Sequence, residues 1–195
     1  SSGSALQTGN TYSTALGHMA FNLGTGFRNT CLGALAGDAA LTGGDNVCVG
    51  YAAGSALLGG AESVIIGSNA GANLTTGTRN IAIGYTAFGT SVTGANDNVA
   101  IGHAALTAAV NSTLNCVAIG TNALAAQNAV AVNLAIGKDA GLLITTGTRN
   151  VLIGHEAGAT FADDSDNTAI GYNALKLSDG AYNVALGGYA GRKIS

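Results

Sequence analysis

The feature that most constrains this chain is a repeat of about 17 residues that runs along almost its whole length. Each unit has a glycine that follows a branched aliphatic residue and precedes an alanine by three positions. Because a unit this short cannot bury a hydrophobic core alone, the sequence predicts units that stack on one another. The repeat glycines lie 16 to 18 residues apart and are Gly17, Gly33, Gly50, Gly67, Gly84, Gly102, Gly120, Gly137, Gly154, Gly171 and Gly187.

The repeats leave no room for a linker or a second domain. We expect a lead-in over residues 1–9, one solenoid of eleven repeats over residues 10–191, and a continuation or tail over residues 192–195.

Each unit contains a segment such as Val-Ala-Ile-Gly at residues 99–102, which predicts a short strand because β-branched residues suit a pleated surface. The glycine-rich breaks leave no window long enough for a stable helix. The rest of each unit is rich in Gly, Ser, Thr and Asn, which predicts turns and a second, shorter strand. The predicted fold is an all-β parallel β-solenoid (a β-roll) with coils about 4.8 Å apart.

Alternation along the strand separates large residues from small ones. Val99 and Ile101 share one face, and Ala100 and Gly102 share the other. We expect the small residues to form the outer face, where another backbone layer could approach closely, which predicts self-association as a homotrimeric fibre. The alternative is a monomer in which the small face packs on the opposite wall of the same narrow coil.

Composition excludes several classes of protein. Apolar residues make up 47% and the net charge is only −3, which disfavours disorder. Only 9% of residues are charged, so the clustered Lys and Arg that nucleic acid requires are missing. No run approaches 18 apolar residues, so we expect no membrane insertion.

The stretch DNTAIGYNALKLSDGAYNVALGGYAG (residues 166–191) resembles the Asn-Thr-Ala-x-Gly-x-x-Ala-Leu repeats of bacteriophage tail fibres and of related large-virus or bacterial surface fibres. It is also similar to the Val-Ala-Ile-Gly repeats of trimeric autotransporter adhesin heads, which form trimeric left-handed parallel β-rolls. The resemblance covers essentially the whole chain and implies a homotrimeric fibre. The chain departs from the pattern where Ser13, Ser63 and Cys116 replace Asn, and where glycine replaces Leu at Gly37, Gly54, Gly71, Gly141, Gly158 and Gly191.

The position that follows the repeat glycine varies from unit to unit and is the candidate for recognition. A varying residue in a constant corner is where a scaffold can display binding groups. The candidates are Tyr51, Tyr85, His103, His155 and Tyr172. His18 shares this position, and no two of the histidines fall in adjacent coils, so they predict a turn exposed to solvent or to a neighbouring chain. The alternative is a metal on a threefold axis, bound by one histidine from each chain.

The acidic stretch at residues 162–167 is a weak calcium candidate through Asp163, Asp164 and Asp166. Its spacing matches no complete calcium loop, so we expect a solvated loop, no bound metal and no cofactor.

Residues at three other positions of the repeat are expected to have structural roles. Cys31 and Cys48 fall at one position of consecutive units that other units fill with Ala, so we expect buried free thiols rather than a disulfide. The position four before the repeat glycine is mostly Asn, which predicts a stacked amide ladder or a turn-forming side-chain hydrogen bond. The position before that Asn carries charges, and stacking would place Glu62 beside Arg79 and Arg79 beside Asp97.

Nothing in the chain resembles a nucleophile with its base, a phosphate loop or a paired-carboxylate cleft, so we expect no enzymatic activity. The expected function is a structural segment of a phage or virus tail fibre, located on the virion tail or an extracellular surface. Contact with a host-surface glycan or protein would be multivalent. The alternative is a bacterial extracellular adhesin or a self-assembling surface filament, and an enzyme-bearing tailspike is a third class.

Overall fold

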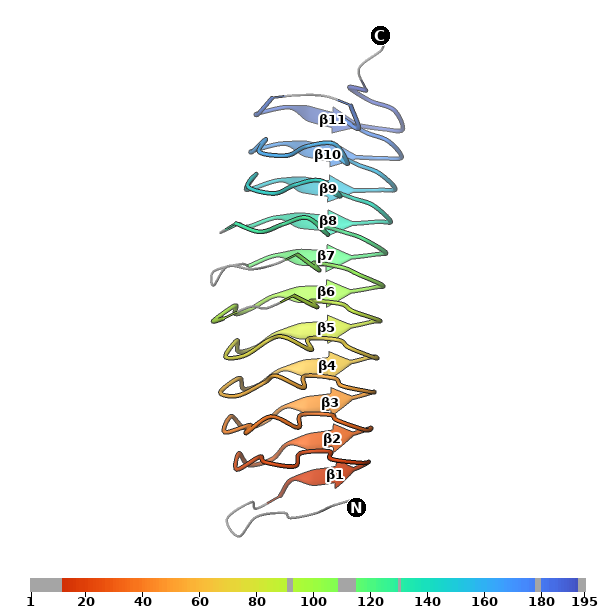
Figure 1. Cartoon of the computed structure of the whole chain (residues 1–195). Coiled ribbons are helices and arrows are strands. Elements are labelled where there is room, and N and C mark those ends of the chain that lie inside the picture. The colour runs from red at the N-terminus through yellow and green to blue at the C-terminus, as the bar shows by residue number, and fades with distance from the viewer. Residues whose placement is uncertain (1–11, 91–92, 109–114, 130, 178–179, 193–195) are drawn as a thin grey trace.

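A computed structural model describes residues 12–90, 93–108, 115–129, 131–177 and 180–192. The expected lead-in at residues 1–9 and the end of the tail at residues 193–195 lie outside this part. The described chain is a stack of coils, each with one three-residue strand (Figure 1). The strands are β1 (Thr14–Leu16), β2 (Thr30–Leu32), β3 (Val47–Val49), β4 (Val64–Ile66), β5 (Ile81–Ile83), β6 (Val99–Ile101), β7 (Val117–Ile119), β8 (Leu134–Ile136), β9 (Val151–Ile153), β10 (Thr168–Ile170) and β11 (Val184–Leu186).

The eleven strands form one parallel sheet in which each strand pairs with the next in the sequence. Equivalent residues pair, as Ala82 does with Ala100, so the register never slips from coil to coil. The predicted parallel β-solenoid is therefore confirmed. We number each coil by its strand.

The expected second strand in each coil is not formed in the described residues. After the corner, the chain returns as turns whose backbone groups bond to the next coil, as when Gly54 N–H donates to Ala70 O at 3.0 Å. Glycines and left-handed residues bend this return segment too often for a continuous strand. Its backbone is nevertheless hydrogen-bonded along the stack, as a buried backbone requires.

The repeat glycines turn the chain sharply at the end of each strand. Gly102 has φ of +132°, a conformation that side chains rarely adopt. A β-carbon on Gly102 would also lie 2.6 Å from Gly120 O in the next coil. Stacking at this distance therefore explains why every unit keeps its glycine.

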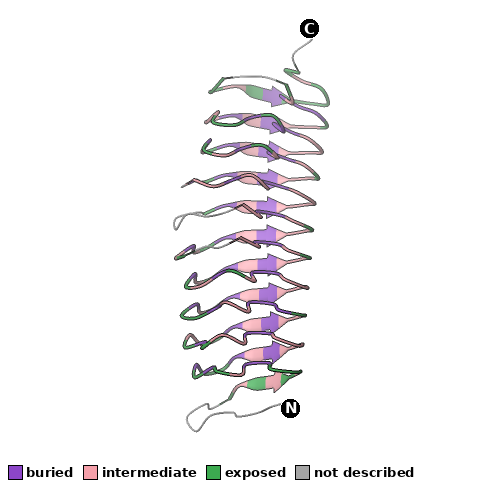
Figure 2. Ribbon diagram, in the orientation of Figure 1, coloured by how far each residue is buried: buried purple, intermediate pink, exposed green. Residues whose placement is uncertain are grey.

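The orientation of the strands is opposite to the predicted one. The middle residue points into the coil, so Ala100 is fully buried, whereas Val99 and Ile101 point outward and are half-buried. Figure 2 shows this alternation along the stack, with buried strand centres and less buried flanks. The expectation of a small-residue outer face is wrong for these residues, which pack on the opposite wall of their own coil. This packing within one chain leaves open whether the chain is a monomer or a trimer.

The narrow interior explains this orientation, because large residues on one wall face small residues on the other. Where the strand centre is Ala82, the position four after the repeat glycine is Phe88, and both are fully buried. Where the centre is Leu152, that position is Gly158, whose β-carbon would lie 2.7 Å from Leu152 Cδ2. Four of the glycines that occupy this position in place of Leu therefore make room for a strand centre larger than Ala. These strand centres are Cys31, Cys48, Ile65 and Leu152.

Candidate functional site: an apolar sheet face between two polar edges

The outward side chains of the strands form one continuous apolar face, which we call the sheet face. In most coils it consists of two β-branched or leucine side chains, such as Val117 and Ile119, shielded only by equivalent residues above and below. In the last strand that the structure describes, Val184 is 81% and Leu186 is 76% exposed. Large exposed apolar patches mark interaction surfaces in soluble proteins.

One edge of the sheet face carries the charged column that the sequence predicted. Arg79 Nε lies 2.6 Å from Asp97 Oδ1 and its second nitrogen lies 2.9 Å from Oδ2, so the pair is bidentate. The expected contact of Arg79 with Asp97 is confirmed. The charge of Glu62 also raises the pKa of Arg79, but less than Asp97 does. Two further pairs of the same geometry follow this edge, Arg28–Asp45 and Arg149–Asp166, each at 2.6 Å.

These arginines change the pKa of the aspartates with which they pair. The hydrogen bonds from Arg28, Arg79 and Arg149 are the main cause that lowers the pKa of the paired aspartates below its ordinary value. The pairs are exposed to solvent, so each contributes little to stability alone. The three pairs join coils 2 and 3, coils 5 and 6, and coils 9 and 10 along this edge.

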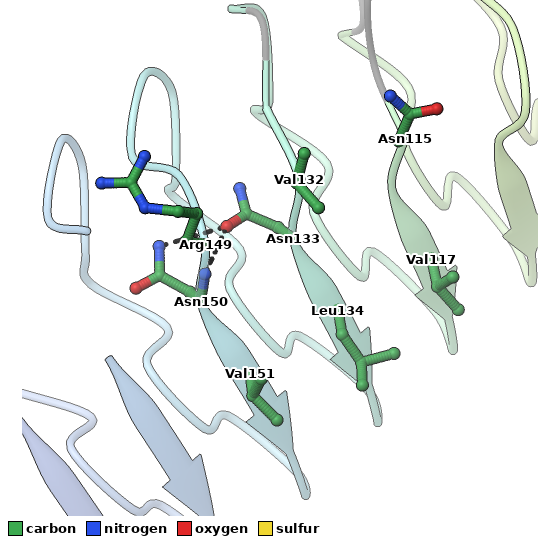
Figure 3. Close-up of a pocket in the computed structure, with 8 residues that line it drawn as sticks. All are labelled: Asn115, Val117, Val132, Asn133, Leu134, Arg149, Asn150 and Val151. Atoms are coloured by element: carbon green, nitrogen blue, oxygen red, sulfur yellow. Dashed lines mark hydrogen bonds between the residues drawn. The ribbon is translucent and has the colours of Figure 1, made fainter. Parts of the chain in front are cut away.

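A shallow depression of about 360 Å³ interrupts the charged edge at coils 7 to 9. It forms where Asn115 and Val132 stand at the position that is charged in coils 2 to 6, 9 and 10. Figure 3 shows Val117, Leu134 and Val151, which line it, in a row across strands β7, β8 and β9. The edge residues Val132 and Arg149 line the same depression as these three strand residues. The charged edge and the outward strand residues therefore belong to one surface.

The other edge carries the varying corner position, and the structure brings the candidate recognition residues together in stacks. Tyr85 lies on His103 with ring centroids 5.5 Å apart and planes within 5°. His155 lies on Tyr172 at 5.2 Å, and Tyr172 meets the ring edge of Tyr189 at 5.3 Å.

Tyr51 is 55% exposed two coils before Tyr85, and His18 is exposed on the first coil. The sequence placed these residues in one column, but the ring-to-ring contacts follow only from the stacking of the coils. This corner column therefore presents aromatic and imidazole groups side by side along the stack.

A cluster of charges accompanies one of these stacks. In coil 9, Glu156 Oε2 lies 2.5 Å from Lys176 Nζ and 3.5 Å from His155 Nδ1. The Glu156 carboxylate therefore forms an ion pair with Lys176 of the next coil. Within the described residues, no group of three or more His, Cys, Asp or Glu side chains could hold a metal ion.

The three aspartates of the calcium candidate have separate contacts. Asp166 is paired with Arg149, and Asp164 Oδ1 accepts a hydrogen bond from Gly180 N–H at 2.9 Å. Asp163 is exposed. Carboxylates directed at different partners do not present a common set of oxygens to a cation.

The cysteines and asparagines lie inside the scaffold. Cys31 and Cys48 pair in adjacent strands as buried free thiols, as predicted. The hydrogen bond to Cys31, together with burial, raises the pKa of the Cys48 thiol, which disfavours the reactive thiolate. Cys116 is also buried and free.

The predicted amide ladder is present. Asn46 Oδ1 accepts Ser63 N–H at 3.1 Å, and Ser63 Oγ accepts Asn80 N–H at 3.1 Å. Asn80 Oδ1 then accepts Asn98 N–H at 3.1 Å. Serine therefore continues the ladder where it replaces Asn.

The fold and these surfaces define the class of protein: a parallel β-solenoid with one apolar face between two polar edges. Comparison of the chain with protein-family models, with curated proteins and with solved structures finds no match. Among the residues that the structure describes, no helix has the length and apolar character of a membrane span.

Sequence reasoning missed the sheet face, although its side chains were in the predicted strands. The signal that could have revealed it is the exchange of Leu for Gly four residues after the repeat glycine. In four coils that exchange accompanies a larger strand centre, which indicates that the strand centre and the return segment share the interior.

Proposed function

We propose that this chain is a rod-like segment of a phage or virus tail fibre, in which three copies assemble through the sheet face. The observation that carries the proposal is the largely apolar face along the outward side of the strands, in which Thr14, Thr30 and Thr168 are the polar members. An isolated rod would leave this face in water along its whole length, whereas association removes it from solvent at about 25 cal/mol for each Å² of apolar area.

The size of the sheet face is sufficient for a stable interface. Eleven strands stacked at about 4.8 Å extend about 50 Å, and a strand together with the edge residues on both sides of it spans roughly 20 Å, which gives roughly 1,000 Å² for the sheet face with its two edges. A typical stable protein interface buries about 800 Å² of each partner. Three copies around a common axis would enclose their outward Val, Ile and Leu side chains, and the closed ring leaves no apolar face free.

The experiment is a measurement of mass by sedimentation equilibrium. We expect three times the chain mass of 18.9 kDa for the native chain. Replacing the outward pair Ile101→Lys and Ile119→Lys should yield monomers that keep the β-sheet circular dichroism signal, since both side chains point out of the coil.

The matched control is Leu143→Lys, which changes a 48% exposed leucine on the return segment and should leave the mass unchanged. A native chain that sediments as a monomer at micromolar concentration would contradict the proposed assembly.

The proposed biological role is to give length and stiffness to a fibre that contacts a host-surface glycan or protein through several weak copies. The resemblance of residues 166–191 to tail-fibre repeats supports the viral assignment. Antibodies against the chain should label virion tails of the source; labelling of bacterial envelopes free of virus would favour the alternative, a bacterial adhesin or surface filament.

A further inference from the structure

We propose that a pyranose ring of a surface glycan binds at the corner of coil 4, in a gap between the side chains of Tyr51 and Tyr85. The proposal rests on the host-surface contact proposed above, and it adds the class of the ligand and the site that binds it. The corner follows the glycine that turns the chain away from the strand, so this site lies beside the sheet face.

The rings of the corner column share one orientation. Tyr85 is parallel to His103 within 5°, and His155 is parallel to Tyr172 within 11°. The centroids of these pairs are 5.5 and 5.2 Å apart, close to the rise of about 4.8 Å per coil, so the ring faces point along the stack. Tyr51 occupies the same position and is 55% exposed, against 54% for Tyr85. We therefore expect Tyr51 to project from the stack as Tyr85 does.

Coil 4 interrupts this column of rings. Its corner residue is Ser68, which follows Tyr51 of coil 3 and precedes Tyr85 of coil 5. The strands of these three coils pair in unbroken register, so their corners lie one above another. The two rings are therefore separated by two coils, about 9.6 Å. Because a serine side chain is much shorter than a tyrosine, a gap remains with an aromatic wall on each side.

The width of the gap selects the shape of the ligand. Carbon atoms in contact lie about 3.5–4.0 Å apart, so a flat ring held between two others needs about 7 Å and would leave one wall of this gap untouched. A pyranose chair is thicker, because its axial hydrogens and hydroxyls stand above and below the ring. Its C–H groups can lie against the negative faces of both tyrosines.

The bottom of the gap offers polar groups to the hydroxyls of such a sugar. Ser68 and the next residue, Asn69, are both half-buried, and together they provide a hydroxyl and an amide. At the equivalent position of coil 7, Asn122 Nδ2 donates to Asp139 Oδ1 of the next coil at 2.9 Å. An amide at this position can therefore reach across one coil. Apolar walls with a few polar groups are typical of small-ligand sites.

A second gap of one coil in the same column lacks this polar floor. His18 and Tyr51 stand on either side of coil 2, whose corner residue is Ala34 and whose next residue is Leu35. Neither side chain can form a hydrogen bond with a sugar hydroxyl. The residues of coil 4 therefore fit a saccharide better than those of coil 2.

Binding of methyl glycosides tests the proposal. The probes are the methyl glycosides of glucose, galactose, mannose and N-acetylglucosamine, with adenine as the flat-ring comparison. The chain has no tryptophan, so its intrinsic fluorescence comes from tyrosine and responds to a sugar that covers these rings. We expect at least one glycoside to quench this fluorescence and to receive saturation transfer at its ring protons in NMR, and we expect no binding of adenine.

Two variants locate the binding. Tyr85→Ala removes one wall and should weaken the binding of that glycoside at least fivefold. Ser68→Tyr fills the gap with a third ring and should weaken binding at least tenfold. This variant should keep the fold, because rings in adjacent coils already stack at Tyr85 and His103.

The matched control is Thr121→Tyr, which adds the same ring at the corner of coil 7, outside the gap. It should leave the affinity unchanged. Circular dichroism of each variant shows that the coils are folded before titration.

The proposal is overturned if no glycoside binds, if adenine binds as well as the sugars, or if Ser68→Tyr binds as tightly as the native chain. Sedimentation of the same samples separates this result from the proposed assembly. Trimers that bind no glycoside would contradict the sugar site alone, and monomers that bind a glycoside would contradict the assembly alone.

Discussion

Leu152 Cδ2 lies so close to Gly158 that a β-carbon on this glycine would be 2.7 Å away. Four coils earlier the sizes are reversed, since Ala82 is the strand centre and Phe88 is the residue on the return segment. The interior therefore has room for one large side chain per coil at this level, supplied by either wall. Close packing of this kind makes the two positions depend on each other.

The first prediction concerns this exchange of volume. Ala82→Leu should destabilise the chain by about 1–3 kcal/mol, because Phe88 already fills the space. Adding Phe88→Gly converts coil 5 to the arrangement of coil 9 and should recover part of the loss. Urea unfolding of the two single variants and the double variant measures the coupling, and simple additivity of the two losses would contradict the shared interior.

The second prediction concerns the corner glycines. Gly102→Ala should lower the free energy of unfolding by more than about 2 kcal/mol, since it combines an unfavourable φ with a 2.6 Å approach to Gly120 O. The control is Gly59→Ala, whose β-carbon would meet only Thr76 Cγ2 at 3.8 Å. Thermal unfolding at equal chain concentration compares the two, and equal losses would show that the corner does not require glycine.

The third prediction concerns the amide ladder. Asn80 Oδ1 accepts two hydrogen bonds from Asn98, and its Nδ2 donates to Ala95 O at 2.7 Å. Asn80→Ala should cost about 1–3 kcal/mol for each buried group left without a partner. Asn80→Ser should cost less, because Ser63 performs the same bridging role in the preceding coil. The measurement is the urea midpoint of each variant, and a serine variant as unstable as the alanine variant would argue against the ladder.

The fourth prediction concerns acid. The arginines lower the pKa of Asp45, Asp97 and Asp166 in the folded chain below the unfolded value of about 3.9. Their stabilising effect is therefore complete above that unfolded value and disappears as pH falls through the folded values. Stability measured from pH 5 down to pH 2 should decline less steeply when all three are changed to Asn. An unchanged acid slope in the triple variant would assign the decline to other groups.

The sequence by itself determined the parallel stack, because the spacing of the repeat glycines fixes one strand per coil. It also determined the amide ladder, the contact of Arg79 with Asp97 and the buried thiols, since residues at one position of consecutive coils must lie one above another. These predictions depend only on which residues share a column.

The tertiary structure alone decided which face of each strand points inward. Alternation states that Val99 and Ile101 lie together, but it does not state whether they face the coil or the solvent. That choice depends on the opposite wall, where residues such as Leu106 already fill the narrow interior and leave space only for Ala100. The large side chains therefore face outward, and the surface proposed here for assembly follows from the volume of the coil interior.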